Sequence, residues 1–359
     1  MKQNNFKKYL NKYAESIDIN IQLYLTDWSK EYAQKAPRLI FLLSYLQEAS
    51  VGGKRVRGTL ICLVYSLFLR RELSSKEKGA ILQVAVAYEI FQTAILAHDD
   101  IIDQSAQRRD KPTLYQQLGG KHYGISQTIS LGDLAFFMAY KIMAECDFPG
   151  DVKTKAIAFF SESITQTVLG QMLDVELTQK KNIYNQDLID EIKNVYLLKT
   201  AYYTFVAPLT IGAILAGSDK KLLEQIKRFG ENIGIVFQIN DDIADIFEKQ
   251  ETSNKDRGAD IKEGKITLLF AKAMQNPNPE QSRVLSKHYG KALIDAKDVA
   301  KIQKVFEQTG ALSFVQTLAD QLEKDARDTV TKMSVSEADK EIFEEIVDYV
   351  SGKEKIVHE

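Results

Sequence analysis

Three observations in the 359-residue chain predict an all-α fold, built as one large helical bundle. Apolar residues recur with the 3.6-residue period of amphipathic helices over most of the sequence. Only six prolines are present, and most of them lie between the periodic segments. No useful length of sequence alternates apolar and polar residues, and no Asn-Gly or Asp-Gly pair marks a hairpin. Because no Gly/Ser-rich linker divides the chain, we expect a single domain over residues 1–359.

Three segments show the helical period most clearly. Residues 78–103 predict a long helix with an apolar face, residues 227–250 predict another, and residues 151–180 predict a third with mixed faces. Residues 1–35 and 280–359 are expected to form supporting helices. Turn-forming and charged residues predict four loops, three of them rich in Lys and Arg, at residues 50–58, 107–113, 248–265 and 275–282.

Composition narrows the class of protein. Hydrophobic residues make up 45% of the chain, which is enough for a sizeable core, and the formal net charge of −2 argues against a general nucleic-acid binder. Cys62 and Cys146 lie in apolar surroundings and indicate neither a disulfide framework nor a metal-binding pair. The N-terminus lacks the apolar core of a signal peptide, and the most apolar stretches are too short to span a bilayer. We therefore expect a cytoplasmic protein without a transmembrane segment, and contact with a membrane surface stays open.

Two acidic motifs, "HDDIIDQ" and "NDDIADI", share the pattern Asp-Asp-x-x-Asp on apolar helices. Asp99 and Asp103 are four residues apart and lie on one helical face, and Asp241 and Asp245 repeat this spacing. Like charges at this spacing oppose helix formation, so a counter-ion is needed. Oxygen ligands favour hard cations such as Mg²⁺, which is usually bound by one or two carboxylates together with substrate phosphates. Two clusters facing each other across a bundle would hold several Mg²⁺ ions and, through them, a diphosphate.

Two other interpretations of the acidic motifs are weaker. A short acidic run usually marks a solvated face, but two runs with the same spacing on apolar helices argue against this. A zinc site is disfavoured because the four histidines show no ligand spacing. His98, next to the first motif, is better explained as a packing residue or as a support for a ligand.

Basic residues supply the other half of the candidate site. Lys54, Arg55 and Arg57 flank a Gly-Gly turn, where the backbone can approach an anion and Arg can make bidentate phosphate contacts. Two arginines after the first acidic motif, a polar pair inside an apolar helix and two lysines around the loop after the second motif complete the set: Arg108, Arg109, Lys199, Thr200, Lys255 and Lys265. Any one of the charged residues in this set is simply explained as a surface charge, above all Lys255, whereas Lys199 in an apolar helix needs a partner. Their number suits two diphosphates rather than one.

Six motifs in this order resemble the trans-isoprenyl diphosphate synthases, also called polyprenyl synthetases. They are "GGKRVRG", "HDDIIDQSAQRR", "GQMLD", "LKTA", "FQINDDIAD" and "GADIKEGKITLL", and they span residues 52–269. The resemblance implies an all-α bundle around a deep central cavity, a homodimer and three Mg²⁺ ions. It also implies head-to-tail condensation of isopentenyl diphosphate with an allylic diphosphate.

The resemblance assigns a role to individual residues. Direct Mg²⁺ binding falls to Asp99, Asp103 and Asp241, supported by Asp100, Asp242 and Asp245. Isopentenyl diphosphate binding falls to Lys54, Arg57, Gln92 and Arg109. Allylic diphosphate binding falls to Arg108, Gln171, Lys199, Lys255 and Lys265. Catalytic groups beside the reacting carbons are expected to be Lys199, Thr200 and Gln238.

Product length is expected from the helix that precedes the first acidic motif. Short-chain members of the family often have an aromatic ring five residues before the first aspartate, where this chain has Ala94, followed by Ile95. The next residue on a similar face is Phe91, about one turn lower. A floor at Phe91 predicts a C20 product, and without it the product would be C25 or longer.

Two departures and two rival functions accompany the resemblance. Asp110 stands where the family usually has Gly, and Lys255 lacks its usual preceding Gly, which affects fine loop geometry. A class I terpene cyclase would have a different second acidic motif and no "GGKRVRG" site. A non-catalytic subunit of a heteromeric prenyl synthase typically loses one or both acidic motifs, and both are present here.

Overall fold

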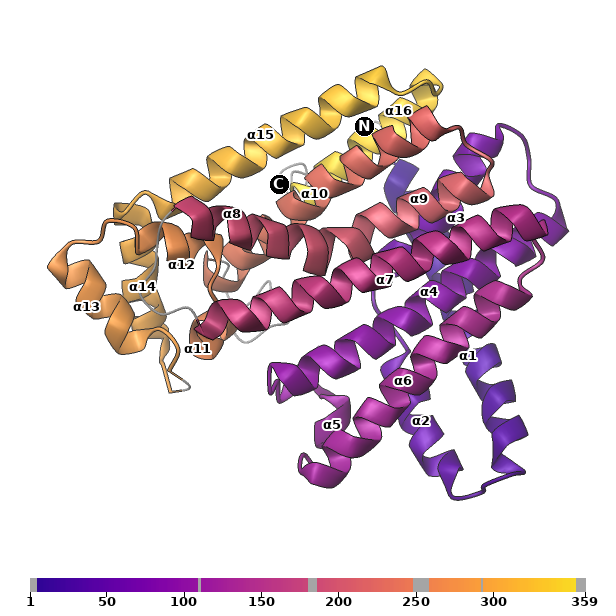
Figure 1. Cartoon of the computed structure of the whole chain (residues 1–359), viewed down its shortest axis with the longest axis horizontal. Helices are drawn as coiled ribbons and strands as arrows, with labels where there is room; N and C mark the ends of the chain where they lie inside the picture. The colour runs from indigo at the N-terminus through magenta and orange to yellow at the C-terminus, as the bar shows by residue number, and fades with distance from the viewer. Residues whose placement is uncertain (1–4, 109–110, 180–185, 248–257, 292, 353–359) are drawn as a thin grey trace. The chain divides into compact units, whose positions relative to one another are not determined.

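The computed structural model describes residues 5–108, 111–179, 186–247, 258–291 and 293–352 (Figure 1). These residues are helical except for loops and one two-stranded hairpin, formed by β1 (Gln107–Arg108) and β2 (Lys111–Pro112). The predicted all-α class is therefore confirmed. The hairpin lies in a segment expected to be a loop, and its strands are too short to show a period in the sequence.

Contacts within the chain define two compact units. Unit 1 comprises Met1–Phe160 and Pro208–Leu223, and unit 2 comprises Ser161–Ala207 and Glu224–Glu359. The single domain expected over residues 1–359 stays a prediction.

Unit 1 centres on one long helix, α4 (Ser75–Ile102), which packs most extensively on α6 (His122–Glu145). A capping box begins α4, because the Ser74 hydroxyl accepts from the Glu77 backbone N–H and the Glu77 carboxylate accepts from that of Ser74. The unit also contains α1 (Asn5–Ala33), α2 (Leu39–Ala49), α3 (Val56–Leu69), α5 (Leu114–Gln117), α9 (Ala207–Leu215) and the first residues of α7 (Gly150–Gln179) and α10 (Lys220–Phe247). The long apolar helix predicted at residues 78–103 is thus α4.

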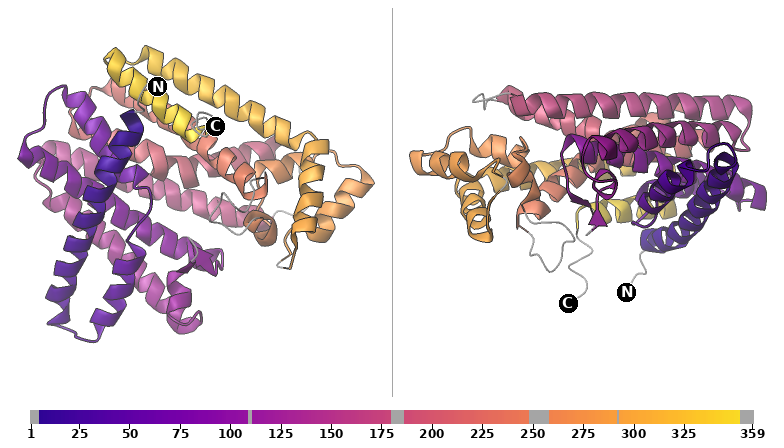
Figure 2. Two further views of the ribbon diagram at one scale, coloured as in Figure 1. Left: turned by 180° about the vertical axis from the view of Figure 1, so that it is seen from behind. Right: turned by 90° about the horizontal axis from the view of Figure 1, so that it is seen from below.

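Unit 2 contains the rest of α7 and α10, which confirms the other two predicted long helices. The remaining helices are α8 (Gln186–Val195), η1 (Tyr196–Val206), α11 (Ala259–Glu263), α12 (Leu268–Ala273), α13 (Pro279–His288), α14 (Ala296–Gln308), α15 (Ala311–Lys332) and α16 (Glu337–Val350). Figure 2 shows α13 beside α14 and α15 beside α16. The supporting role expected of residues 1–35 and 280–359 stays a prediction. The prediction of a loop at residues 248–265 is wrong over α11, because the five residues of this helix are too few to show a periodic pattern.

Element η1 is an 11-residue π-helix. Its wider turn displaces side chains from the register of an α-helix, and such segments are frequent at functional sites. Lys199 and Thr200 lie within it, so the first two catalytic candidates occupy an irregular part of the backbone.

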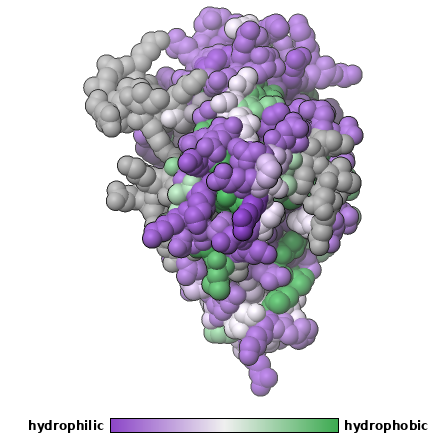
Figure 3. Space-filling view, turned by 90° about the vertical axis from the view of Figure 1, so that its left-hand side faces the viewer, coloured by the Kyte–Doolittle hydropathy of each residue, from purple (hydrophilic) through white to green (hydrophobic). Residues whose placement is uncertain are grey.

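Apolar residues lie mainly inside the helical units. The face seen in Figure 3 is mostly hydrophilic, with hydrophobic side chains in small patches. Two helices, Ser75–Ile102 and Gln186–Leu215, have membrane-like length and hydropathy, but their most apolar windows are 72% and 67% buried within the protein. Such burial is typical of core helices. Both Cys62 and Cys146 are free and buried, as expected.

Candidate functional site

The first acidic motif lies at the carboxyl end of α4. Asp99 and Asp100 belong to its last turn, and Asp103 is the residue after it, with its backbone N–H bonded to the Asp99 carbonyl oxygen at 2.8 Å. Asp100 is buried, whereas Asp99 and Asp103 are half-buried. The hairpin brings Arg108 to the motif, where its Nε donates to Asp100 Oδ1 at 2.9 Å and its Nη2 lies 3.5 Å from Asp99 Oδ2. A fixed positive charge therefore already offsets part of the repulsion between these carboxylates.

This donor set fits a hard divalent cation. All the groups are carboxylate oxygens, and two of them lie on one helical face. Within the described ranges, no group of three or more His, Cys, Asp or Glu side chains is placed to hold a metal by itself. Mg²⁺ needs no such cage, since it keeps water and binds through one or two carboxylates and substrate phosphates.

A second feature of unit 1 is the turn before α3, where Arg55 has a left-handed backbone (φ 50°). Its guanidinium is buried, donates from Nε to Asp18 Oδ1 at 2.8 Å and from Nη1 to Glu89 Oε2 at 3.2 Å, and also contacts the Ser50 carbonyl oxygen. Arg55 was grouped with its neighbours as a phosphate contact. That interpretation is wrong, because its donors hold the turn against α1 and α4.

Glu89 joins this turn to two of the predicted isopentenyl diphosphate binders. Its Oε1 accepts from the Gly58 backbone N–H at 2.8 Å. In the orientation that satisfies its amide, Gln92 donates to Glu89 Oε2 at 2.9 Å and accepts from Arg57 Nη1 at 2.8 Å. The structure thus brings Arg57 and Gln92 together, as expected, and leaves Lys54 exposed. Glu89 was missed, although a charged residue in the apolar run "VAYEIFQ" was a usable signal.

We predict that Glu89→Gln destabilises the protein by about 1.5–3 kcal/mol, the usual worth of hydrogen bonds to a charged group. The substitution keeps the side-chain shape but turns a donor toward Arg55. Chemical denaturation would measure the loss. Glu72→Gln, an exposed carboxyl in the same unit, is the control and should leave stability unchanged.

The second acidic motif lies on α10 in unit 2. Asp242 and Asp245 are buried, and Asp241 is half-buried. The Asp245 carboxylate accepts from the backbone N–H groups of Ala259 and Asp260, both at 3.2 Å, and thereby holds the start of α11. The predicted support of Mg²⁺ binding by Asp245 stays a prediction.

Asp242 forms part of a buried hydrogen-bonded group. Its carboxylate accepts from the Tyr196 hydroxyl and, at Oδ1, from Gln238 Nε2 at 2.7 Å. Burial raises the pKa of Asp242 well above its usual range, and the nearby charge of Asp260 adds to this. Burial likewise raises the pKa of Tyr196, followed by the effect of the Asp242 charge.

The catalytic candidates on η1 both have partners in unit 2. Lys199 Nζ lies 2.5 Å from Asp174 Oδ2 on α7, which supplies the partner that an apolar helix required. A Cβ added at Gly170 would lie 2.3 Å from the Lys199 backbone nitrogen, so only glycine allows this close approach of helices. The Thr200 hydroxyl donates to Gln238 Oε1 at 2.7 Å.

Three other allylic diphosphate candidates have different surroundings. The buried amide nitrogen of Gln171 has no hydrogen-bond partner in the part of the chain that the structure describes. Lys265 forms ion pairs with Asp260 at 3.3 Å and Glu263 at 3.0 Å. Lys255, together with the isopentenyl diphosphate candidate Arg109, lies outside the described residues.

The predicted chain-length residues lie on α4 inside unit 1. Phe91 is 1% exposed, and its ring packs edge-on against Phe160 with centroids 5.0 Å apart. Ala94 is fully buried and Ile95 is half-buried. Phe136 also contacts Phe91, with ring centroids 5.7 Å apart. A contiguous aromatic cluster therefore occupies the level at which the floor is expected.

Comparison with known proteins identifies the family. A model of the polyprenyl synthetase family matches residues 41–309, and the chain belongs to this family. The geranylgeranyl diphosphate synthase of Sulfolobus acidocaldarius is 28% identical over 331 residues, which cover 92% of each chain. The geranylfarnesyl diphosphate synthase of Natronomonas pharaonis is 27% identical, covering 88% of this chain and 90% of its own.

The solved structures agree with this result. A geranylgeranyl pyrophosphate synthase from Corynebacterium glutamicum, complexed with isoprenyl diphosphate and magnesium, superposes with a TM-score of 0.88 at 25% identity. The match covers 95% of this chain and 99% of that one. The protein is thus a prenyltransferase of isoprenoid biosynthesis that elongates trans-prenyl chains and uses a divalent metal.

Proposed function

We propose that this enzyme condenses isopentenyl diphosphate with an allylic diphosphate head to tail and releases all-trans geranylgeranyl diphosphate (C20), with Mg²⁺ as its metal. The observation that carries the proposal is the set of buried and half-buried carboxylates in two Asp-Asp-x-x-Asp motifs, with Arg108 at the first. The separate Arg57–Gln92 pair supports a second anion site. The magnesium in the Corynebacterium glutamicum complex supports the choice of metal.

Mg²⁺, when bound, would neutralise charge on the allylic diphosphate and on the departing pyrophosphate. Its ligands would be Asp99, Asp103 and Asp241, for three ions in all. Arg108 and Lys199 would hold the allylic diphosphate, with Gln171, Lys255 and Lys265 as further contacts. The positive charges of the arginine and lysine side chains would stabilise the negative charge that builds on the leaving diphosphate, which is electrostatic catalysis.

The protein's polar groups would act where the allylic cation meets isopentenyl diphosphate. The carbon–oxygen bond of the allylic diphosphate breaks, and the double bond of isopentenyl diphosphate attacks the resulting cation. Lys199, Thr200 and Gln238 shield that cation, and the released pyrophosphate takes the proton lost from the new chain. No protein nucleophile is needed.

We predict that Arg57→Ala raises the KM for isopentenyl diphosphate about 10–100-fold and leaves the KM for the allylic substrate nearly unchanged. The reason is the loss of a charge-assisted phosphate contact worth about 1.5–3 kcal/mol. Initial rates with each substrate varied in turn would measure it. Arg38→Ala, at an exposed arginine of the same unit, is the control. Equal rises in both KM values would argue against separate diphosphate sites.

One assay separates the proposal from its rivals. Labelled isopentenyl diphosphate would be incubated with Mg²⁺ and each allylic primer in turn, and products analysed by mass. Linear elongation to C20 supports the proposal. A cyclic hydrocarbon would indicate a terpene cyclase, and no turnover would indicate a non-catalytic subunit.

We also propose that the protein is a cytoplasmic homodimer that releases its product at a membrane surface. The family resemblance supports the dimer, and the apolar tail of the product supports release at a membrane. Sedimentation equilibrium of the purified protein would test the dimer, and a molecular mass of one chain would contradict it.

A further inference from the structure

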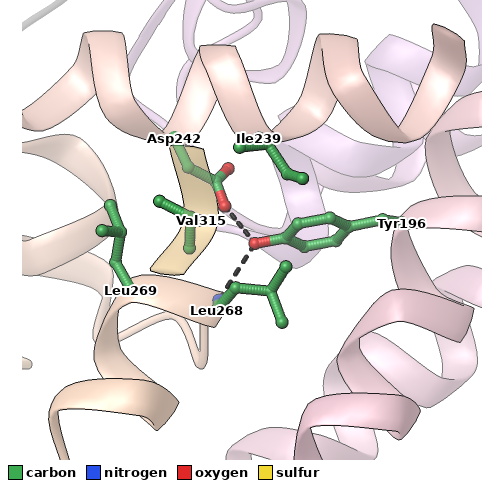
Figure 4. Close-up of a pocket in the computed structure, with 6 residues that line it drawn as sticks. All are labelled: Tyr196, Ile239, Asp242, Leu268, Leu269 and Val315. Carbon is green, nitrogen blue, oxygen red and sulfur yellow. Dashed lines mark hydrogen bonds between the residues drawn. The ribbon is translucent and has the colours of Figure 1, made fainter. Parts of the chain in front are cut away.

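A directed series of hydrogen bonds connects three helices of unit 2. The Leu268 backbone N–H, at the start of α12, donates to the Tyr196 hydroxyl oxygen at 3.1 Å. Figure 4 shows that hydroxyl between Leu268 and the Asp242 carboxylate, to which it donates. Gln238 Nε2 donates to the other Asp242 oxygen at 2.7 Å, and Gln238 Oε1 accepts from the Thr200 hydroxyl at 2.7 Å.

The direction of each bond follows from its neighbours. The Tyr196 oxygen accepts from a backbone N–H, so its own proton points to Asp242. Because Asp242 accepts at both oxygens, the amide group of Gln238 is turned so that its carbonyl faces Thr200. The Thr200 proton is then committed to Gln238, and the remaining lone pairs of the Thr200 oxygen point elsewhere.

Burial makes this arrangement rigid. Tyr196 is 6% exposed and Asp242 is 4% exposed. Hydrogen bonds in such a low-dielectric setting are strong, and an unmade one is costly. Without the hydroxyl, one Asp242 oxygen would lose its donor, and the carboxylate could rotate away from Gln238.

We propose that Tyr196 is a positioning residue for chain elongation. Its hydroxyl fixes the Asp242 carboxylate, which through Gln238 orients Thr200 so that its oxygen faces the developing allylic cation. This inference rests on the proposed function, in which Thr200 and Gln238 lie beside the reacting carbons. Neither the acidic motifs nor the family assignment gives a role to Tyr196.

The test is Tyr196→Phe, which removes one oxygen atom and keeps the ring. We expect kcat to fall about tenfold, the equivalent of one net hydrogen bond, with the KM for isopentenyl diphosphate within twofold of wild type. The control is Tyr202→Phe, the same change in the same π-helix at a half-buried tyrosine, and it should keep full activity.

A double-mutant cycle with Thr200→Val distinguishes positioning from general structural support. If Tyr196 acts through Thr200, the loss caused by Tyr196→Phe should nearly vanish in the Thr200→Val background. Turnover of a 2-fluoro allylic diphosphate, whose cation is harder to form, should fall more in Tyr196→Phe than turnover of the unsubstituted substrate.

Three results would overturn the inference: wild-type kcat in Tyr196→Phe, additive losses in the cycle, or equal losses with both substrates. Wild-type protein that fails to join the two diphosphates would instead contradict the proposed function. Thermal unfolding of each variant keeps loss of fold separate from loss of positioning.

Discussion

Replacing Asp99 or Asp241 with alanine is expected to lower turnover by at least about 10²–10³-fold and to leave the helices intact. Mg²⁺ at these positions would stabilise charge on the departing diphosphate, and the loss of even one such stabilising group costs this much in comparable sites. Neither side chain is part of the apolar core, since both are half-buried at or near helix ends. Without metal, the stability of each variant should equal or exceed that of wild type, because repulsion between like charges is relieved.

The measurement pairs turnover with metal binding and thermal unfolding. Titration calorimetry with Mg²⁺ and a non-reactive diphosphate should show weaker metal binding in both variants. Asp147→Ala, at an exposed aspartate of unit 1, is the matched control and should behave as wild type. Wild-type turnover in either Asp99→Ala or Asp241→Ala would remove that residue from the metal site.

Helical periodicity made most of the fold predictable. The long helices α4, α7 and α10 each present an apolar face over many turns, so their pattern is redundant and survives local exceptions. Short elements such as α11 and the β1–β2 hairpin have too few residues for any period. The π-helical form of η1 could not be predicted from the sequence either, because its composition matches that of an ordinary apolar helix.

The candidate site was predictable where its residues carry charge in a repeated motif. Arg108 lies beside the first acidic motif in unit 1, and Lys199 has the partner that a charge in an apolar helix requires. Arg55 was misassigned because a positive charge beside a glycine turn has the same sequence signature whether it binds an anion or a buried carboxylate. The contact with Glu89, 34 residues away, distinguishes the two cases.

Tyr196 is a clearer example of a polar contact that the local sequence does not reveal. A tyrosine in an apolar helix is normally explained by packing, and nothing local reveals that its hydroxyl meets Asp242, 46 residues further along the chain. Non-local polar partners are set by the tertiary packing of helices, which the period of one helix does not encode.

Shortening the side chain of Phe91 is expected to change the product itself. The allylic tail is proposed to grow along α4 from the first acidic motif, past the small Ala94, until it meets the ring of Phe91. Three residues of α-helix span about 4.5 Å, close to one isoprene unit, so Phe91 as the floor gives C20. Phe91→Ala would open the next level of the channel, and the main product should become C25 or longer.

The Phe91→Ala variant is also expected to lose stability, so the experiment needs a control variant with a comparable loss of stability. Phe91 is packed against other rings in the core of unit 1, so Phe91→Ala should cost about 3–5 kcal/mol. Phe91→Leu fills more of the volume, and it should lengthen the product with a smaller loss of stability. Phe6→Ala, at a fully buried phenylalanine on α1, should destabilise the protein comparably and leave the product unchanged.

Product masses would be measured with excess isopentenyl diphosphate at a temperature where every variant is folded. Longer products from both Phe91 variants, but not from Phe6→Ala, would establish Phe91 as the floor. An unchanged distribution with retained activity would rule it out. The floor would then lie on another helix, and the aromatic cluster of Phe91 and Phe160 would serve only to hold α4 in the core of unit 1.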